Sequence, residues 1–152
     1  AERELLEAAA LLSNVGLFVS HSGHHKHSYY VIRNSEHLMG FTDREIELIA
    51  QVARYHRKSQ PSEDKHAEFA ALAEADRHRV RSMAGVLRVA IGLDRNHDGA
   101  VDQVEVRVED GRAVLRLVAV EDDGDLTLER YSADHRSSLL SQQLGCEVVV
   151  EA

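Results

Sequence analysis

Apolar residues follow a helical period over the first 92 residues of this chain and a strand period after them. The helical part breaks at polar or glycine-containing stretches and at the only proline, Pro61. Helices are predicted over four segments: 2–12, about 25–37, 43–58 and 62–92. Residues 1–92 are therefore predicted to form a helical domain.

Local residues indicate where these helices begin. Thr42 precedes the third helix and Glu45 follows three positions later, which is the pattern of a capping box. Ser22 is a candidate cap for the second helix, and Gly16 is expected to end the first. Gly85 lies inside the fourth pattern, where it predicts close packing of another helix.

The period changes to two after Gly92, and residues 104–120, VEVRVEDGRAVLRLVAV, predict a hairpin with an Asp-Gly turn. Residues 125–144 are predicted to be one helix, with Gly145 as its C-cap and a last strand in 146–151. Residues 93–152 thus form a small ββαβ subdomain. The predicted fold class is α+β, with this subdomain after the helical domain.

The composition limits the classes of protein to which the chain can belong. With 152 residues and 43% hydrophobic content, the chain can bury a core, and no apolar run reaches the length of a membrane span. The single Cys146 excludes an internal disulfide and favours a cytoplasmic setting. The net charge of −8 comes from residues 93–152, where 14 acids stand against 6 Lys and Arg. A uniformly basic, nucleic-acid-binding chain is not indicated.

Residues 21–33, HSGHHKHSYYVIR, place four histidines and a lysine within seven positions. Metal ligation, anion binding and simple helix capping are all open. Imidazole suits transition metals, but a hydrolytic metal site also needs carboxylates, and the nearest acid is Glu36. A helix start favours anions through its free N–H groups and dipole. Phosphate contact is therefore predicted for four side chains: His24, His25, Lys26 and His27.

A second basic cluster, RYHRK at residues 54–58, ends the third predicted helix. Cations are favoured at a helix C-terminus, so a purely structural role is one interpretation. The other is that it joins the first cluster in one cationic patch, because Arg and Lys both bind phosphate. This cluster supplies four more candidates for phosphate binding: Arg54, His56, Arg57 and Lys58. A weak metal site at His21, His25 and His56 is the alternative.

Residues 93–105, LDRNHDGAVDQVE, match a calcium-loop pattern. The candidate ligands are Asp94, Asn96, Asp98, Asp102 and Glu105. An EF-hand requires a helix after the loop, whereas residues 104–110 alternate like a strand. The other interpretation is a polar connection between a helix and a strand. No nucleophile motif, phosphate-binding glycine loop or zinc motif occurs, so no catalytic residue is assigned.

Three long sequence motifs resemble those of a known protein family: HSGHHKHSYYVI (21–32), GFTDRE (40–45) and ARYHRKSQP (53–61). With LRVAIGLDRN (87–96), they resemble the C-terminal HD-like region of the exopolyphosphatase/guanosine pentaphosphate phosphatase (Ppx/GppA) family. The resemblance covers essentially the whole chain. Ser13 and Asn14 stand where that family has a His-Asp doublet, which ligates the catalytic metal in the wider HD superfamily. Ser and Asn are poor ligands for such a metal, so a metal-dependent reaction is not expected there.

The resemblance implies that the helical domain is HD-like and is truncated on its N-terminal side. It implies a parent enzyme that hydrolyses phosphoanhydrides of polyphosphate or guanosine pentaphosphate, with its magnesium-dependent site in actin-like domains upstream. This chain would bind polyanion, would hold no cofactor, and would carry out no chemical step alone. The alternatives are a degenerate HD-type metal-dependent phosphohydrolase and a dimerisation or interaction domain. No partner in a membrane and no specific nucleic acid is expected.

Overall fold

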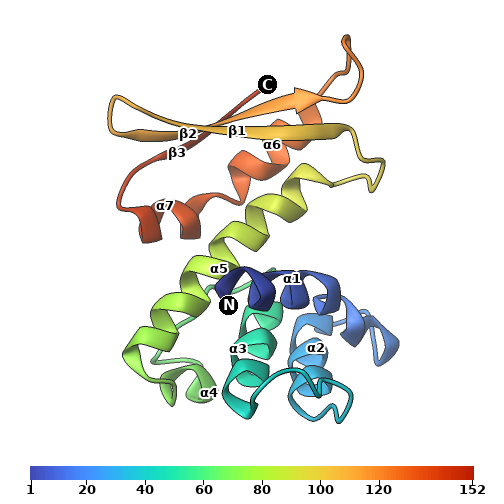
Figure 1. Cartoon of the computed structure of the whole chain (residues 1–152), viewed down its shortest axis with the longest axis vertical. Helices are drawn as coiled ribbons and strands as arrows, with labels where there is room; N and C mark the ends of the chain where they lie inside the picture. The colour runs from blue at the N-terminus through green and yellow to red at the C-terminus, as the bar shows by residue number, and fades with distance from the viewer. The chain divides into compact units, whose positions relative to one another are not determined.

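The computed structural model describes residues 1–152, with seven α-helices, one short 3-10 helix and three strands (Figure 1). The chain is therefore α+β. The elements are α1 (Glu2–Leu12), η1 (Val15–Phe18), α2 (His24–Arg33), α3 (Asp43–Arg54), α4 (Ala67–Ala70), α5 (Glu74–Leu93), β1 (Val101–Glu109), β2 (Arg112–Ala119), α6 (Thr127–His135), α7 (Ser138–Leu144) and β3 (Val148–Glu151). No helix combines the length and the apolar content that crossing a membrane requires.

The chain divides into two compact units, Ala1–Ala84 and Gly85–Ala152, here called the helical unit and the sheet unit. The division falls within α5, which supplies residues to both units. The domain boundary predicted at residues 92 and 93 stays a prediction, because compactness does not test which segments fold independently. Each unit is described by itself below.

Helix α3 forms the centre of the helical unit. Thr42 Oγ1 accepts a hydrogen bond from the Glu45 N–H, and the Glu45 side chain accepts one from the Thr42 N–H, so the predicted capping box is confirmed. Six consecutive residues of α3, Leu48–Ala53, are buried. Both α1 and α2 contact this helix. The capping box and the burial of α3 thus make it the central helix against which α1 and α2 pack.

A close approach holds α2 against the turn before it. Ser28 Oγ donates to the Ser13 carbonyl at 2.7 Å and accepts from the Gly16 N–H at 2.9 Å. A Cβ on Gly16 would lie 2.2 Å from the His24 carbonyl oxygen, so only glycine fits there. Gly16 does not simply end α1, as its sequence position suggested; it lies in η1 and lets α2 come close.

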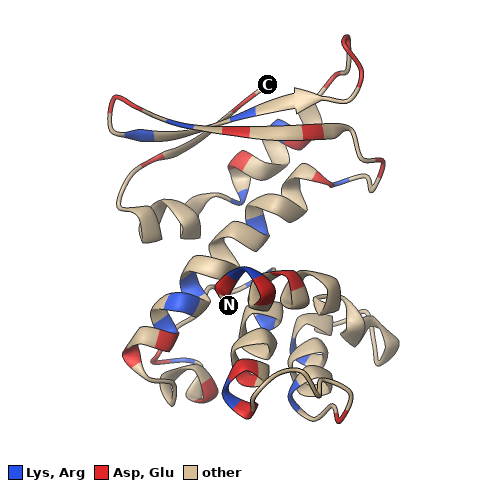
Figure 2. Ribbon diagram, in the orientation of Figure 1, with Lys and Arg blue, Asp and Glu red and all other residues tan.

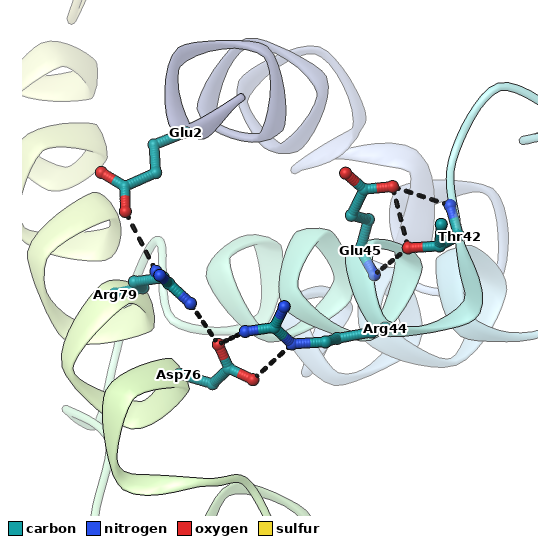
Figure 3. Close-up of polar contacts among 6 residues, drawn as sticks. All are labelled: Glu2, Thr42, Arg44, Glu45, Asp76 and Arg79. Carbon is teal, nitrogen blue, oxygen red and sulfur yellow. Dashed lines mark hydrogen bonds and ion pairs between the residues drawn. The ribbon is translucent and has the colours of Figure 1, made fainter.

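A buried carboxylate ties three helices of this unit together (Figure 3). Asp76 of α5 is 5% exposed and accepts from Arg44 Nε at 2.8 Å and from Arg44 Nη2 at 2.6 Å. Arg79 Nη1 donates to the same carboxylate at 2.9 Å, and Arg79 Nε donates to Glu2 of α1 at 3.0 Å. The two arginines hold the pKa of Asp76 below its usual range. This network fixes the first turns of α3 and α5.

The sheet unit has a three-stranded sheet in the order β1-β2-β3, with β1 antiparallel and β3 parallel to β2. The turn at Asp110 and Gly111 has φ values of 49° and 73°, as the predicted Asp-Gly hairpin requires. The core gathers residues from α5, β2, β3, α6 and the N-cap of α6: Val89, Ala113, Leu115, Leu117, Leu126, Ala133, Val148 and Val150. Gly145 caps α7 with φ 67°, as predicted.

Four local predictions need correction. The helix predicted over 62–92 is two helices, α4 and α5, because residues 62–66 are irregular and the helix is interrupted again at 71–73. The helix predicted over 125–144 is also two, α6 and α7, so the subdomain is ββααβ rather than ββαβ. The second helix ends at Arg33, not 37, and its N-cap is Gly23 at φ 66° rather than Ser22. A left-handed cap suits glycine, so Ser22 is not needed there.

Gly85 confirms its predicted packing role inside the sheet unit. A Cβ there would lie 3.0 Å from the Leu140 backbone of α7. Gly92 is tighter still, because a Cβ would lie 2.6 Å from Ala133 of α6. The second half of α5 therefore approaches α6 and α7 through two glycines. The sequence indicated the first of these contacts and not the second.

Candidate functional site

Helices α2 and α3 run antiparallel and side by side (Figure 1), and this pairing brings the two basic clusters together. At one end of the pair, Arg33 of α2 bonds Asp43 and Glu47 of α3. At the other end, the first turn of α2 meets the residues that follow α3. Arg57 Nη1 lies 3.0 Å from His24 Nδ1, and the ring centroids of His24 and His56 are 5.3 Å apart. The predicted convergence of the clusters is therefore observed.

His24, His56 and Arg57 form a compact group in which both histidines are buried, at 5% and 4% exposure. Two groups compete for His24 Nδ1: the Arg57 N–H can donate to it only when it carries no proton, and the His21 carbonyl at 3.2 Å can accept from it only when it carries one. When Arg57 donates, the His24 proton is on Nε2, which is buried without a hydrogen-bond partner. His56 Nδ1 donates to the Ala53 carbonyl. Neutral imidazole thus orients the Arg57 guanidinium.

Burial keeps these histidines neutral. It is the main cause that lowers the pKa of His56 to about 4, against an ordinary value near 6.5. Burial also lowers the pKa of His25 to about 4, with Arg57 and Lys26 as further causes. The pKa of His24 is lowered by burial and by Arg57, against the opposing effect of the His21 carbonyl. The permanent positive charge of the site therefore comes from its arginines and lysines.

A pocket of about 220 Å³ opens beside this group. Its lining comes from the start of α2, the end of α3 and the segment after α3: His25, Lys26, Arg54, Tyr55, Ser59, Lys65 and His66. We call it the α2–α3 pocket. Three of the seven residues are Lys or Arg, and His25 Nδ1 is buried without a hydrogen-bond partner. The pocket is thus suited to an anion that accepts hydrogen bonds.

The lining residues are held in place by contacts around them. Arg54 lies over the rings of Tyr29 and Tyr55, at 5.5 and 5.6 Å from their centroids, and pairs with Glu68 at 3.3 Å. His66 Nδ1 accepts from the Ser62 N–H at 3.1 Å, and its ring lies 5.2 Å from Tyr55. Arg54 and His66 are therefore held in place by contacts around the pocket.

The sequence predictions identified only part of this lining. Of the eight predicted residues, His25, Lys26 and Arg54 line the pocket, and His24, His56 and Arg57 lie in the adjacent group. His27 and Lys58 belong to neither. Ser59 was missed because it lies just after the predicted cluster at 54–58, and Lys65 and His66 were missed because residues 62–92 were taken as one helix. The sequence did contain an indication that Lys65 belongs to the site, since the chain has only three lysines and all lie between residues 26 and 65.

The residues of this site are poor ligands for magnesium. Magnesium prefers carboxylates and other oxygen ligands, whereas the site offers imidazole, guanidinium and ammonium groups. No group of three or more His, Cys, Asp or Glu side chains in the chain could hold a metal ion. The candidate ligands His21, His25 and His56 do not form such a group. Ser13 is buried and bonds Ser28, and Asn14 next to it is exposed.

The calcium-loop pattern also does not gather its ligands. The loop leads into strand β1 rather than a helix, as the alternating pattern indicated. Asp102 and Glu105 lie on that strand, where three residues span about 10 Å. Asp98 instead accepts from the Ala100 N–H at 3.2 Å, a bond within the turn. The structure supports a polar connection between α5 and β1.

Charge is unevenly distributed along the chain (Figure 2). Acidic residues crowd the loop between β2 and α6, residues 121–125, which carries no Lys or Arg. The segment from 54 to 58 holds three cations and no acid. The local charge is therefore positive in the segment that ends the α2–α3 pair and negative in the β2–α6 loop.

Comparison with known proteins agrees with the family resemblance of the sequence motifs. A family model described as "Ppx/GppA phosphatase, domain III" matches residues 1–141. A guanosine-5'-triphosphate,3'-diphosphate pyrophosphatase of Pseudoalteromonas translucida (strain TAC 125) is 31% identical over 107 residues. That match covers 70% of this chain and 20% of the relative, so the chain spans about a fifth of that relative's length. The chain belongs to the Ppx/GppA phosphatase domain III family.

Proposed function

We propose that this chain is the polyanion-binding part of a Ppx/GppA-type phosphatase and that it binds phosphate groups of polyphosphate in the α2–α3 pocket. The observation that carries the proposal is the meeting of two basic clusters, 24–27 and 54–58, at one end of a helix pair. Each cluster alone has a structural explanation. Their convergence on a pocket lined by Lys26, Arg54 and Lys65 supports a shared anionic ligand.

The size of the pocket bears on the ligand. At about 220 Å³ it is smaller than the roughly 300 Å³ at which sites for drug-sized molecules begin. It therefore suits one or two phosphate groups better than a guanine nucleotide. Phosphate groups outside the pocket would meet Arg57 and Lys58. This favours polyphosphate over guanosine pentaphosphate as the ligand of the pocket.

Histidine protonation would couple to binding. A bound phosphate stabilises the charged form of a neighbouring imidazole and so raises its pKa. His25 lines the pocket and is neutral at pH 7 because its pKa is about 4. Binding should therefore strengthen as the pH falls toward the raised pKa of His25, where the complex takes up a proton. The arginines and lysines supply the part of the affinity that does not depend on pH.

The chemical step belongs elsewhere in this proposal. We place it, with its magnesium, in actin-like phosphatase domains that the family resemblance puts before residue 1. We also infer that the helical unit is an HD-like domain whose metal doublet has become Ser13 and Asn14. The rival is a degenerate HD phosphohydrolase. Metal-dependent turnover by this chain that is lost in His25→Ala would favour the rival.

The proposal is tested by binding of long-chain polyphosphate to the purified chain over a range of salt. Affinity should fall steeply with salt, and Lys26→Ala or Lys65→Ala should each lower the salt slope by about 1. Arg130→Ala, on the exposed face of α6, is the matched control and should behave as wild type. No binding at low salt, or equal losses in the pocket variants and the control, would refute the proposal.

A further inference from the structure

Strand β1 carries an apolar row that the sheet unit leaves uncovered. Val104, Val106 and Val108 are 38%, 67% and 79% exposed. Their partners on β2 are Leu117, Leu115 and Ala113, and all three belong to the buried core. Cross-strand partners share one face of a sheet, so this row extends the core-facing side of the sheet beyond its cover.

The same strand is also an open edge. It is the first strand in the order β1-β2-β3, so only one of its sides is paired, and it is nine residues long. The opposite edge, β3, has only four residues. Long apolar edges invite pairing with another strand, and soluble proteins usually shorten or block them. The feature of β1 that comes closest to blocking such pairing is the irregularity in its pairing with β2 at Val101–Gln103. Residues 103–109 pair regularly.

We propose that β1 pairs antiparallel with β1 of a second copy of this chain, about a two-fold axis at Val106. In this register Val106 faces its own equivalent and Val104 faces Val108 of the second copy. Glu105 of each copy then faces Arg107 of the other, which places two opposite-charge pairs on the other face. Over residues 103–109, the regular part of the strand, β1 is thus complementary to itself in both charge and polarity, as a two-fold interface requires.

Neighbouring registers lack this match. An axis at Glu105 would set Glu105 against its own equivalent. An axis at Arg107 would set Arg107 against itself and Glu105 against Glu109. Like charges directly opposite one another are destabilising, and a shift by one residue would mix the apolar and charged faces. Charge therefore selects the Val106 register among those that keep the valines together.

The charged side chains that this pairing needs, Glu105 and Arg107, are exposed and only weakly engaged within the chain. Glu105 pairs within the chain only with Arg116, at 3.6 Å, and both side chains are at least half exposed. Arg107 pairs with Glu109 at 3.3 Å and with Glu151 at 3.7 Å, again among exposed side chains. Exposed pairs of this kind contribute little to stability. Exchanging them for contacts across the two-fold axis therefore costs little.

Charge reversal and restoration test the pairing. The full chain should show a monomer–dimer equilibrium in sedimentation equilibrium. Glu105→Arg or Arg107→Glu alone should weaken the dimer about tenfold or more, because each sets like charges opposite at two symmetric places. The double exchange E105R/R107E should restore wild-type association. Arg112→Glu, which alters an exposed charge on β2, is the control and should leave the dimer intact.

Two further measurements decide between occupants of the edge. Val106→Cys in a Cys146→Ser background should oxidise to a disulfide-linked dimer, whereas Val120→Cys, exposed and outside β1, should not. In wild type, alternate amides of β1 should gain hydrogen-exchange protection as concentration rises. A chain that stays monomeric at high concentration, or a dimer indifferent to the charge exchanges, would overturn the proposal and leave the edge to a different partner.

Discussion

The buried histidine of the site predicts a specific loss of stability in mild acid. His56 is 4% exposed, and its pKa is lowered to about 4 in the folded chain, against about 6.5 when unfolded. Between these values the unfolded state binds a proton that the folded state does not. Stability from this group is therefore complete above pH 6.5 and is lost as the pH falls toward 4.

The size of the loss follows from the pKa difference. One unit of pKa corresponds to about 1.4 kcal/mol, so His56 should cost about 2 kcal/mol at about pH 5 and about 3 kcal/mol below pH 4. His25 should add to this in the same direction and by a smaller amount, because it is only partly buried. Losses of this size are a large share of the total stability of an ordinary domain.

Urea unfolding followed by circular dichroism at several pH values measures this dependence. His56→Asn should keep a donor for the Ala53 carbonyl while removing the titrating ring. We expect the variant to lose about 2 kcal/mol less than wild type between about pH 7 and about pH 5. His78→Asn changes an exposed histidine and should follow wild type. Equal pH slopes for wild type and His56→Asn would refute the reasoning.

Two packing predictions accompany it. Gly16→Ala should cost about 3 kcal/mol in urea unfolding, because the new Cβ would meet the His24 carbonyl at 2.2 Å. Gly40→Ala, with nothing within 4 Å of its Cβ, should cost almost nothing, and similar losses in both would contradict the argument. Asp76→Asn should cost about 2 kcal/mol, because Arg44 loses a buried ionic partner. An unchanged melting temperature would exclude that role for Asp76.

Much of the fold follows from local rules that the sequence expresses clearly. The capping box at Thr42, the Asp110-Gly111 turn and the Gly145 cap are all found where the pattern placed them. Each is determined within a few residues, so no knowledge of the rest of the molecule is needed. The α+β class follows from the change of hydrophobic period after Gly92 for the same reason.

Features that depend on tertiary packing were not accessible in this way. The break at 71–73, between α4 and α5, is invisible to periodicity, because the Ala and Leu residues there are good helix formers. Lys65 and His66 reach the site only because residues 55–66 fold back along the end of α3. The neutral state of His24 and His56 depends on burial by both helices. A histidine-rich motif suggests positive charge, but burial in the folded chain keeps these histidines neutral.

The antiparallel pairing of α2 and α3 makes the site sensitive to positions remote from any ligand. Ten residues of helix span about 15 Å, so a tilt of about 5° at the Arg33 end moves the His24 end by more than about 1 Å. That displacement exceeds the margin between a 3.0 Å hydrogen bond and a broken one. The ion pairs of Arg33 with Asp43 and Glu47 thus act as the fulcrum of a lever, and variation there would shift His24 against Arg57, beside the proposed phosphate site, without altering either residue.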